Sequence, residues 1–194
     1  MAKTEKERPL GAGKSSFELI DAEKVFGEIG LQRGSTFLDM ACGLGRYAIA
    51  ASKIVGDDGL IYAVDLWEEG IRALQEEASA RGIKNLKASV SDVGKTLPIP
   101  DHQVDVCLMA TVLHDLVQTR DDEGALKELV RVLNTQGLLA VIEFKKIDGP
   151  PGPPIGVRLT PDAVEGIVLP YGFRKKQFVE VGLYNYLMIF DVIS

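Results

Sequence analysis

The residues best suited to chemistry lie in a glycine loop between a predicted buried strand and a predicted helix. The strand occupies residues 36–40, and Gly43 and Gly45 follow it before the chain turns helical near Ala48. Glycine lets the backbone turn sharply and approach a ligand without a Cβ in the way. The start of the following helix offers unpaired N–H groups and a partial positive charge, which suit a carboxylate or a phosphate. The loop therefore predicts a binding site for a ligand with a charged end.

Two aspartates beside this loop narrow the choice of ligand. Asp39 comes four residues before Gly43, where its carboxylate would repel a pyrophosphate but attract an ammonium group. Asp65 ends the next predicted strand, where a carboxylate can accept hydrogen bonds from both hydroxyls of a ribose. Together they predict a ligand that has an amino-acid end and a nucleoside end.

A third acid, Asp92, ends the next strand and is placed to accept a hydrogen bond from an adenine amino group. Leu66 and Val93 follow these acids and are expected to sandwich the ring. In the alternative interpretation, each aspartate only caps the helix that follows it. Three acids at successive strand ends favour the binding site, because ligands of such sheets lie at the carboxyl ends of the strands.

His114 and Asp115 follow the fourth predicted strand and are the candidate catalytic residues. A histidine with an ordinary pKa of ~6.5 can take a proton from a thiol, a phenol or an activated carbon. Asp115 then orients the imidazole or caps the helix. The alternative is a structural histidine at a helix start, which is the role expected of His102, the second histidine.

The elements that position these residues alternate between strands and helices. Apolar runs of strand length, suited to burial on both faces, cover residues 36–40, 60–64, 86–90, 104–110 and 138–144. Helical patterns lie between them, and Gly82 and Gly137 are expected to end two of the helices. Residues 93–100 leave room for only a short helix. This alternation predicts a parallel sheet in an α/β fold, with helices on both sides.

The ends of the chain are expected to form the substrate side of a single domain, residues 1–194. Residues 1–14 are predicted to be disordered, and a helix or lid follows over 15–34, opened by a capping box of Ser15 and Glu18. The cofactor-binding core is predicted over 35–146. A proline-rich loop, a helix over 160–169 and a hairpin of strands 177–181 and 184–192 around Gly182 complete residues 147–194. The predicted substrate pocket contains Phe17, Arg46, Tyr47 and His114.

Composition excludes several functional classes. The chain of 194 residues carries a formal net charge of −6, which argues against nucleic acid as a partner. No apolar run reaches the ~18 residues of a membrane span. The two cysteines lack the paired spacing of a metal site, so no metal and a reduced, cytoplasmic setting are expected. A small-molecule substrate, bound by a monomer or homodimer, is the expected partner.

The combined motifs resemble class I S-adenosylmethionine-dependent methyltransferases, most closely the ubiquinone/menaquinone-methyltransferase-like group. The motifs that carry the resemblance, across residues 37–144, are LDxxCGxG from Leu38, VD at Val64, SD at Ser91, LPxPD from Leu97, VD at Val104 and RVL from Arg131. The resemblance implies a Rossmann-like three-layer αβα sandwich, with a seven-stranded, mostly parallel sheet and an antiparallel last strand. The cofactor is then S-adenosyl-L-methionine, and its expected contacts are Asp39, Ala41, Gly43, Gly45, Asp65, Leu66, Ser91, Asp92, Val93 and Thr111.

Methyl transfer to O, S or C of a small molecule is the activity that this resemblance implies. The Asn/Asp-Pro-Pro-aromatic motif of enzymes that methylate exocyclic amines is absent after the fourth strand, where the sequence reads Ala110-Thr-Val-Leu-His114. A protein-directed enzyme and a non-catalytic adenosylmethionine-binding protein remain alternatives. An NAD-dependent oxidoreductase is a remote one, because Gly43, Gly45 and Ala48 also fit a dinucleotide-binding spacing, although Asp39 argues against a pyrophosphate there.

Overall fold

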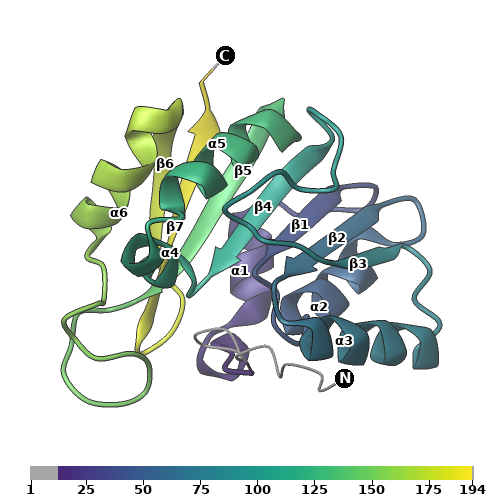
Figure 1. The fold of residues 1–194 in the computed structure, drawn as a ribbon, viewed down its shortest axis with the longest axis horizontal. Helices are drawn as coiled ribbons and strands as arrows, with labels where there is room; N and C mark the ends of the chain where they lie inside the picture. The colour runs from purple at the N-terminus through teal and green to yellow at the C-terminus, as the bar shows by residue number, and fades with distance from the viewer. Residues whose placement is uncertain (1–12, 194) are drawn as a thin grey trace, which may run out of the picture.

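A computed structural model describes residues 13–193 and shows a seven-stranded sheet with helices on both faces (Figure 1). The strands are β1 (Thr36–Met40), β2 (Leu60–Asp65), β3 (Leu86–Val90), β4 (Val104–Ala110), β5 (Leu133–Phe144), β6 (Phe173–Glu180) and β7 (Asn185–Val192). They lie in the order β3-β2-β1-β4-β5-β7-β6; β7 pairs antiparallel with β5 and β6, and all the other neighbouring strands pair parallel. The predicted fold class, including the antiparallel last strand, is confirmed.

The helices form two layers, one on each face of the sheet. They are η1 (Phe17–Leu19), α1 (Ala22–Glu28), α2 (Arg46–Val55), α3 (Glu68–Ala80), α4 (Leu113–Thr119), α5 (Asp122–Val132), α6 (Pro161–Val168) and η2 (Leu169–Tyr171). Side chains of α4, α5 and α6 share one buried cluster with the sheet, and those of α1, α2 and α3 share another. The carboxyl ends of the five parallel strands β1 to β5 therefore open at one edge between the layers.

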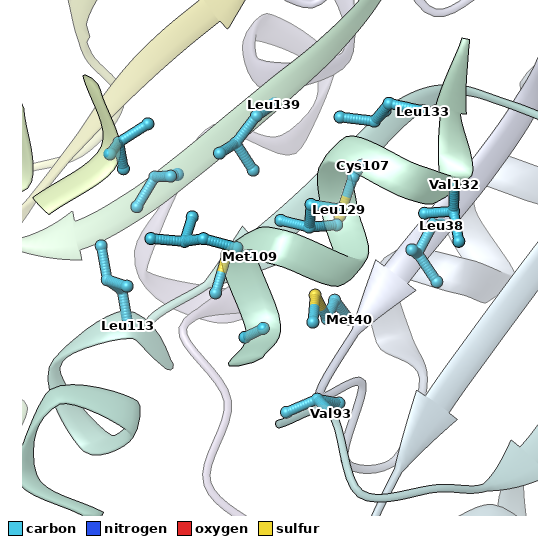
Figure 2. Close-up of a cluster of buried hydrophobic side chains, with 14 of the residues drawn as sticks. Leu38, Met40, Val93, Cys107, Met109, Leu113, Leu129, Val132, Leu133 and Leu139 are labelled. Atoms are coloured by element: carbon cyan, nitrogen blue, oxygen red, sulfur yellow. The ribbon is translucent and has the colours of Figure 1, made fainter. Parts of the chain in front are cut away.

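Alternation along the inner strands β1, β2, β4, β5 and β7 supplies both clusters, as expected of strands covered on both faces. Leu38 and Met40 of β1 pack in the cluster that contains α5, beside Cys107 and Met109 of β4 (Figure 2). Phe37, which comes just before Leu38 and points to the other face of the sheet, packs in the opposite cluster. Buried packing on both sides fixes the ends of β1 and β4, where the glycine loop and His114 begin.

The N-terminal helix starts later than predicted, and the capping box at Ser15 is wrong. The helix α1 begins after Asp21, whose Oδ1 accepts a hydrogen bond from the Lys24 N–H at 2.9 Å. Ile20 has extended backbone angles and separates α1 from the short turn η1. The Ser15 hydroxyl instead accepts a hydrogen bond from the Phe17 N–H. Asp21 thus provides the cap that was assigned to Ser15.

Two further expectations for the middle of the chain are wrong. Gly137 does not end α5. The helix ends at Val132, and β5 begins at the next residue, Leu133, which pairs with Val104 of β4. A register shift between Val104 and Val106 accommodates this early pairing. Residues 93–100 form no helix, and Arg131 donates hydrogen bonds to carbonyls of this segment instead.

The predicted hairpin at the end of the chain is present as β6 and β7. The strand β6 lies at the sheet edge and carries the exposed basic side chains Arg174, Lys175 and Lys176, in line with the solvated edge expected for them. Disorder was expected of residues 1–14, of which residues 1–12 lie outside the described residues. No helix within residues 13–193 is long and apolar enough to cross a membrane.

Candidate functional site

The glycine loop joins β1 to α2 and adopts a conformation that most residues avoid. Ala41, Gly43 and Gly45 all have positive φ, at 59°, 55° and 68°. A non-glycine residue in this region is uncommon, and such strain concentrates at functional sites. Asp39 is 1% exposed, and its Oδ2 accepts a hydrogen bond from the Ala48 N–H at 2.9 Å. The Asp39 side chain therefore anchors the loop to the first turn of α2.

Asp65 ties the end of β2 to the same loop. Its Oδ2 accepts a hydrogen bond from the Gly43 N–H, and its Oδ1 accepts one from the Trp67 N–H, each at 2.7 Å. A carboxylate offers about four acceptor positions, so both oxygens keep capacity for a ligand. Asp65 is half-buried and faces the cavity described below. It is thus positioned both to shape the loop and to bind hydroxyl groups.

The third acid lies further from this centre. Asp92 accepts a hydrogen bond from the Gly94 N–H at 3.1 Å and pairs with Lys95, whose hydrogen bond lowers the pKa of Asp92. Val93 is 8% exposed and belongs to the core cluster, whereas Leu66 is 55% exposed. The Ser91 N–H donates to the Asp65 carbonyl. Leu66 follows β2, whereas Ser91, Asp92 and Val93 follow β3, and none of them lines the main cavity.

The main cavity has a volume of about 700 Å³ and lies at the carboxyl ends of the strands. Six of the predicted site residues line it: Ala41, Gly43, Asp65, Thr111, His114 and Asp115. Its other walls are Gly13, Lys14, Ser15, Ser16, Leu19, Ala110, Val112, Gln118, Phe144, Pro151, Gly152, Pro153, Pro154 and Val157. One hollow thus joins the predicted cofactor loop to the predicted catalytic residues.

His114 lines this cavity and is held by a residue that the sequence analysis missed. Nδ1 of His114 lies 2.8 Å from Oε2 of Glu143, and the His114 N–H donates to Oε1 at 3.1 Å. Nε2 lies 3.6 Å from Oδ1 of Asp115. Glu143 is fully buried near the end of β5. Its signal in the sequence was a single acid within an otherwise apolar strand, Val141-Ile-Glu-Phe144.

These carboxylates control the protonation of the imidazole. Burial lowers the pKa of His114, but the hydrogen bond and negative charge of Glu143, with the charge of Asp115, outweigh it and raise the pKa above the usual value. Burial, partly offset by the nearby His114, raises the pKa of Asp115. The imidazole is therefore a stronger base than a free histidine side chain.

Three predicted pocket residues lie elsewhere. Phe17 and Arg46 line a separate hollow of about 610 Å³ with residues of α2 and α3. Tyr47 is buried, its hydroxyl lies 2.9 Å from the Ser16 Oγ, and its ring meets Phe17 edge to face. The structure does not bring these three side chains together with His114. Within residues 13–193, no group of three acidic, histidine or cysteine side chains could hold a metal ion.

Two other sequence expectations concern the remaining histidine and the loop glycines. His102 has its Nδ1 3.1 Å from the Leu133 carbonyl, away from the cavity residues, which agrees with a structural role. Gly45 begins α2 in the left-handed conformation, and a Cβ there would lie 2.4 Å from the Leu74 side chain. The glycine at this position is required by both the turn and the packing of α3.

Comparisons with known proteins give one consistent family. Residues 38–141 match the family model described as Methyltransferase domain. The chain is similar to the Ubiquinone/menaquinone biosynthesis C-methyltransferase UbiE of Azotobacter vinelandii, with 31% identity over 117 residues, which cover 60% of this chain and 45% of that protein. The Yersinia enterocolitica protein of the same name is 33% identical with the same coverage. The chain thus spans about half the length of the curated relatives it matches.

Solved structures resemble nearly the whole chain. A SAM dependent methyltransferase from Aquifex aeolicus has a TM-score of 0.83 and 36% identity, covering 93% of this chain and 94% of that one. The PH0226 protein from Pyrococcus horikoshii OT3 has a TM-score of 0.72 and 21% identity, covering 88% and 87%, which shows a shared fold alone.

Proposed function

The chain belongs to the family of S-adenosylmethionine-dependent methyltransferase domains, and from this premise we propose that it methylates oxygen, sulfur or carbon of a small molecule. The names of the curated relatives, which are C-methyltransferases, favour carbon. Because the chain spans 45% of their length, oxygen and sulfur stay in the proposal.

S-adenosylmethionine fits the residues at the ends of β1 and β2. When bound, it supplies a methyl group already activated on a sulfonium. A Cβ added to Gly43 would meet only the Lys14 carbonyl, at 4.0 Å, so the loop borders open space. Asp65 keeps acceptor positions for the ribose hydroxyls beside that space. Asp39, anchored to Ala48, is the proposed partner of the ammonium group, whose positive charge favours the ionised carboxylate.

Other predicted contacts keep their assignments within this proposal. Ala41 and Thr111 line the cavity with their backbones in the left-handed region. Gly45 shapes the loop from its position at the start of α2. The proposed border of the adenine is formed by Ser91, Asp92 and Val93 after β3 and by the exposed Leu66 after β2.

His114 is the proposed base at the acceptor end. The hydrogen bond to Glu143 holds the proton on Nδ1 of a neutral imidazole, so Nε2 is the atom that accepts the proton of the acceptor. Asp115, near Nε2 and beside the cavity, favours the imidazolium that forms when Nε2 takes this proton. Glu143 acts through His114 and is a positioning residue. Displacement of a sulfonium methyl otherwise requires alignment and exclusion of water, which a walled cavity supplies.

One observation carries the proposal: the glycine loop and a carboxylate-held imidazole line the same cavity. A domain that only bound adenosylmethionine would not need a buried acid–histidine pair facing the bound ligand. We therefore place the acceptor between His114 and residues 151–154, and not in the hollow that Phe17 and Arg46 line.

Calorimetry with S-adenosylhomocysteine and with NAD tests the first half of the proposal. We expect binding of the former at micromolar strength or better, with no binding of NAD. Binding of NAD alone would instead support an oxidoreductase. The second half is tested with methyl-labelled S-adenosylmethionine and three acceptors: thiophenol for sulfur, 1-naphthol for oxygen and 2-methylhydroquinone for carbon.

The two histidines provide a matched pair of variants for this assay. We expect His114→Asn to lose transfer while it still binds S-adenosylhomocysteine, and His102→Asn to retain both. If the wild-type protein binds S-adenosylhomocysteine but transfers no methyl group to these acceptors, a binding protein or a protein-directed enzyme becomes the better account.

A further inference from the structure

Arg158 is a buried cation whose guanidinium donates five hydrogen bonds to backbone carbonyl groups. It is 3% exposed, and none of the ion pairs found among residues 13–193 includes it. Its Nε donates to the Pro153 carbonyl at 2.8 Å, and its Nη2 donates to Gly149 at 2.7 Å and Pro151 at 2.9 Å. Its Nη1 donates to Ile147 at 2.6 Å and Lys145 at 3.3 Å. A guanidinium has five N–H donors, and each one here has its own carbonyl.

The five carbonyls belong to alternate residues, 145, 147, 149, 151 and 153, so the chain wraps around the guanidinium. This segment and the residues after it contain Pro150, Pro151, Pro153 and Pro154. Proline has no N–H, so the loop cannot pair these carbonyls through a regular backbone ladder. The buried Arg158 side chain instead provides a hydrogen-bond donor for each of these carbonyls from one point. The shape of the loop therefore depends on a single side chain.

The outer side of this wrapped loop forms a wall of the main cavity. Pro151, Gly152, Pro153 and Pro154 line it together with Phe144. The Arg158 guanidinium lies 5.6 Å from the centre of the Phe144 ring. A Cβ on Gly152, whose φ is 100°, would come within 2.7 Å of that ring. Guanidinium, ring and loop are thus packed together without room for another carbon atom.

We propose that Arg158 is a positioning residue that fixes an apolar wall of the acceptor site opposite the glycine loop. The inference rests on the proposed function and deepens it by naming the class of acceptor. Proline rings and Phe144 offer the acceptor no side-chain donor or acceptor, whereas His114 lies in the same cavity. The acceptor that fits has a flat or alkyl apolar body and one ionisable group, as a phenol or an aromatic thiol has. The wall is held in place before the acceptor binds.

Arg158→Lys keeps the charge but loses the planar fork of five donors, so it tests this role directly. Amide hydrogen exchange over residues 145–157 is expected to accelerate at least tenfold, while exchange in β1 and β4 stays unchanged. In protein saturated with S-adenosylhomocysteine, the Kd for 1-naphthol, followed by its fluorescence, is expected to rise at least tenfold. The Kd for S-adenosylhomocysteine should change less than twofold.

Two further variants complete the experiment. Arg174→Lys, on the exposed edge strand, should match the wild-type protein in every measurement. Gly152→Ala alters the wall without removing the guanidinium. It too should raise the Kd for 1-naphthol and leave the Kd for S-adenosylhomocysteine unchanged. It decides the role of the wall even if Arg158→Lys does not fold.

The outcomes separate this inference from the proposed function. Unchanged exchange in Arg158→Lys, or unchanged 1-naphthol affinity in both wall variants, would overturn the role of Arg158. Failure of the wild-type protein to bind 1-naphthol at millimolar concentration would overturn the apolar class of acceptor. If 1-naphthol binds as expected but neither it nor the other test acceptors is methylated, the role of Arg158 in the wall is supported and the proposed function is overturned.

Discussion

Nδ1 of His114 at the start of α4 lies 2.8 Å from Oε2 of Glu143 at the end of β5. Both side chains are buried, and the same carboxylate also accepts the backbone N–H of His114. A buried carboxylate costs free energy unless it is paired, and this pairing satisfies Glu143 while it orients the ring. The contact between Glu143 and His114 therefore determines the pH dependence that we expect of the proposed base.

The pH dependence of methyl transfer should reveal this pairing. Glu143 and Asp115 raise the pKa of His114, and a base must be neutral, so kcat/KM should increase with pH through a midpoint above 6.5. Glu143→Gln removes the main charge that favours the imidazolium and leaves burial, which lowers the pKa. We expect the midpoint to move to lower pH in this variant, measured as a kcat/KM profile with 1-naphthol or thiophenol.

His114→Asn should reduce kcat by a factor of roughly 100 or more, which is the usual contribution of a positioned base. A profile that is flat in the wild-type protein, or a midpoint that Glu143→Gln leaves in place, would show that this pair does not titrate during the reaction.

Asp65→Asn should raise the Kd for S-adenosylhomocysteine at least tenfold. The carboxylate accepts hydrogen bonds from the N–H groups of Gly43 and Trp67. The amide keeps only one oxygen, so its NH₂ group faces one of these two N–H groups and leaves it without an acceptor. Both the loop geometry and the ribose contact are then lost. Calorimetry measures the change, with the exposed Asp57→Asn as control. Wild-type affinity in Asp65→Asn would remove Asp65 from the site.

Asp39 should make the stability of the ligand-free protein depend on pH. Burial, with the charge of Asp65 and against the hydrogen bond from Ala48, raises the pKa of Asp39 from 3.8 to about 7. The folded state therefore holds a proton that the unfolded state releases, and this contribution to stability decreases as the pH rises from about 4 to about 7. A difference of about three pKa units corresponds to roughly 4 kcal/mol.

Asp39→Asn should remove this part of the pH dependence. Urea unfolding at several pH values measures it, and the exposed Asp58→Asn serves as control because Asp58 pairs only with surface Arg33 among the ion pairs of residues 13–193. We expect the free energy of unfolding of Asp39→Asn, relative to the wild-type protein, to increase between pH 5 and pH 7. The same pH dependence in both proteins would contradict the assignment.

Gly45→Ala should be more destabilising than Gly34→Ala. Both glycines have positive φ, 68° and 84°, but a Cβ on Gly34 meets nothing within 4 Å, whereas one on Gly45 overlaps Leu74. We expect a loss of about 1–2 kcal/mol at Gly34, from strain alone. At Gly45 we expect roughly 2–5 kcal/mol, because overpacking adds to strain. Urea denaturation measures both, and equal losses would mean that Leu74 moves aside at no cost.

The sequence by itself determined the framework of this protein and the family to which it belongs. Apolar runs predicted the bounds of β1 and β4, because strands buried on both faces must be apolar throughout. The bounds of the edge strand β3, which is only partly buried, were predicted as well. The glycine loop and Asp65 could be placed together because the carboxyl ends of parallel strands share one edge. Local signals were weaker at the start of α1, which Asp21 caps in place of the predicted Ser15.

Only the tertiary structure decided which side chains meet. Glu143 lies 29 residues from His114 in the sequence, and the contact depends on the register of β5 beside β4 and on the packing of α4. Arg158 binds carbonyls, which carry no residue identity and so leave no pattern to read. Hydrophobic periodicity reports which face of an element is buried, whereas a contact between distant side chains depends on how whole elements pack.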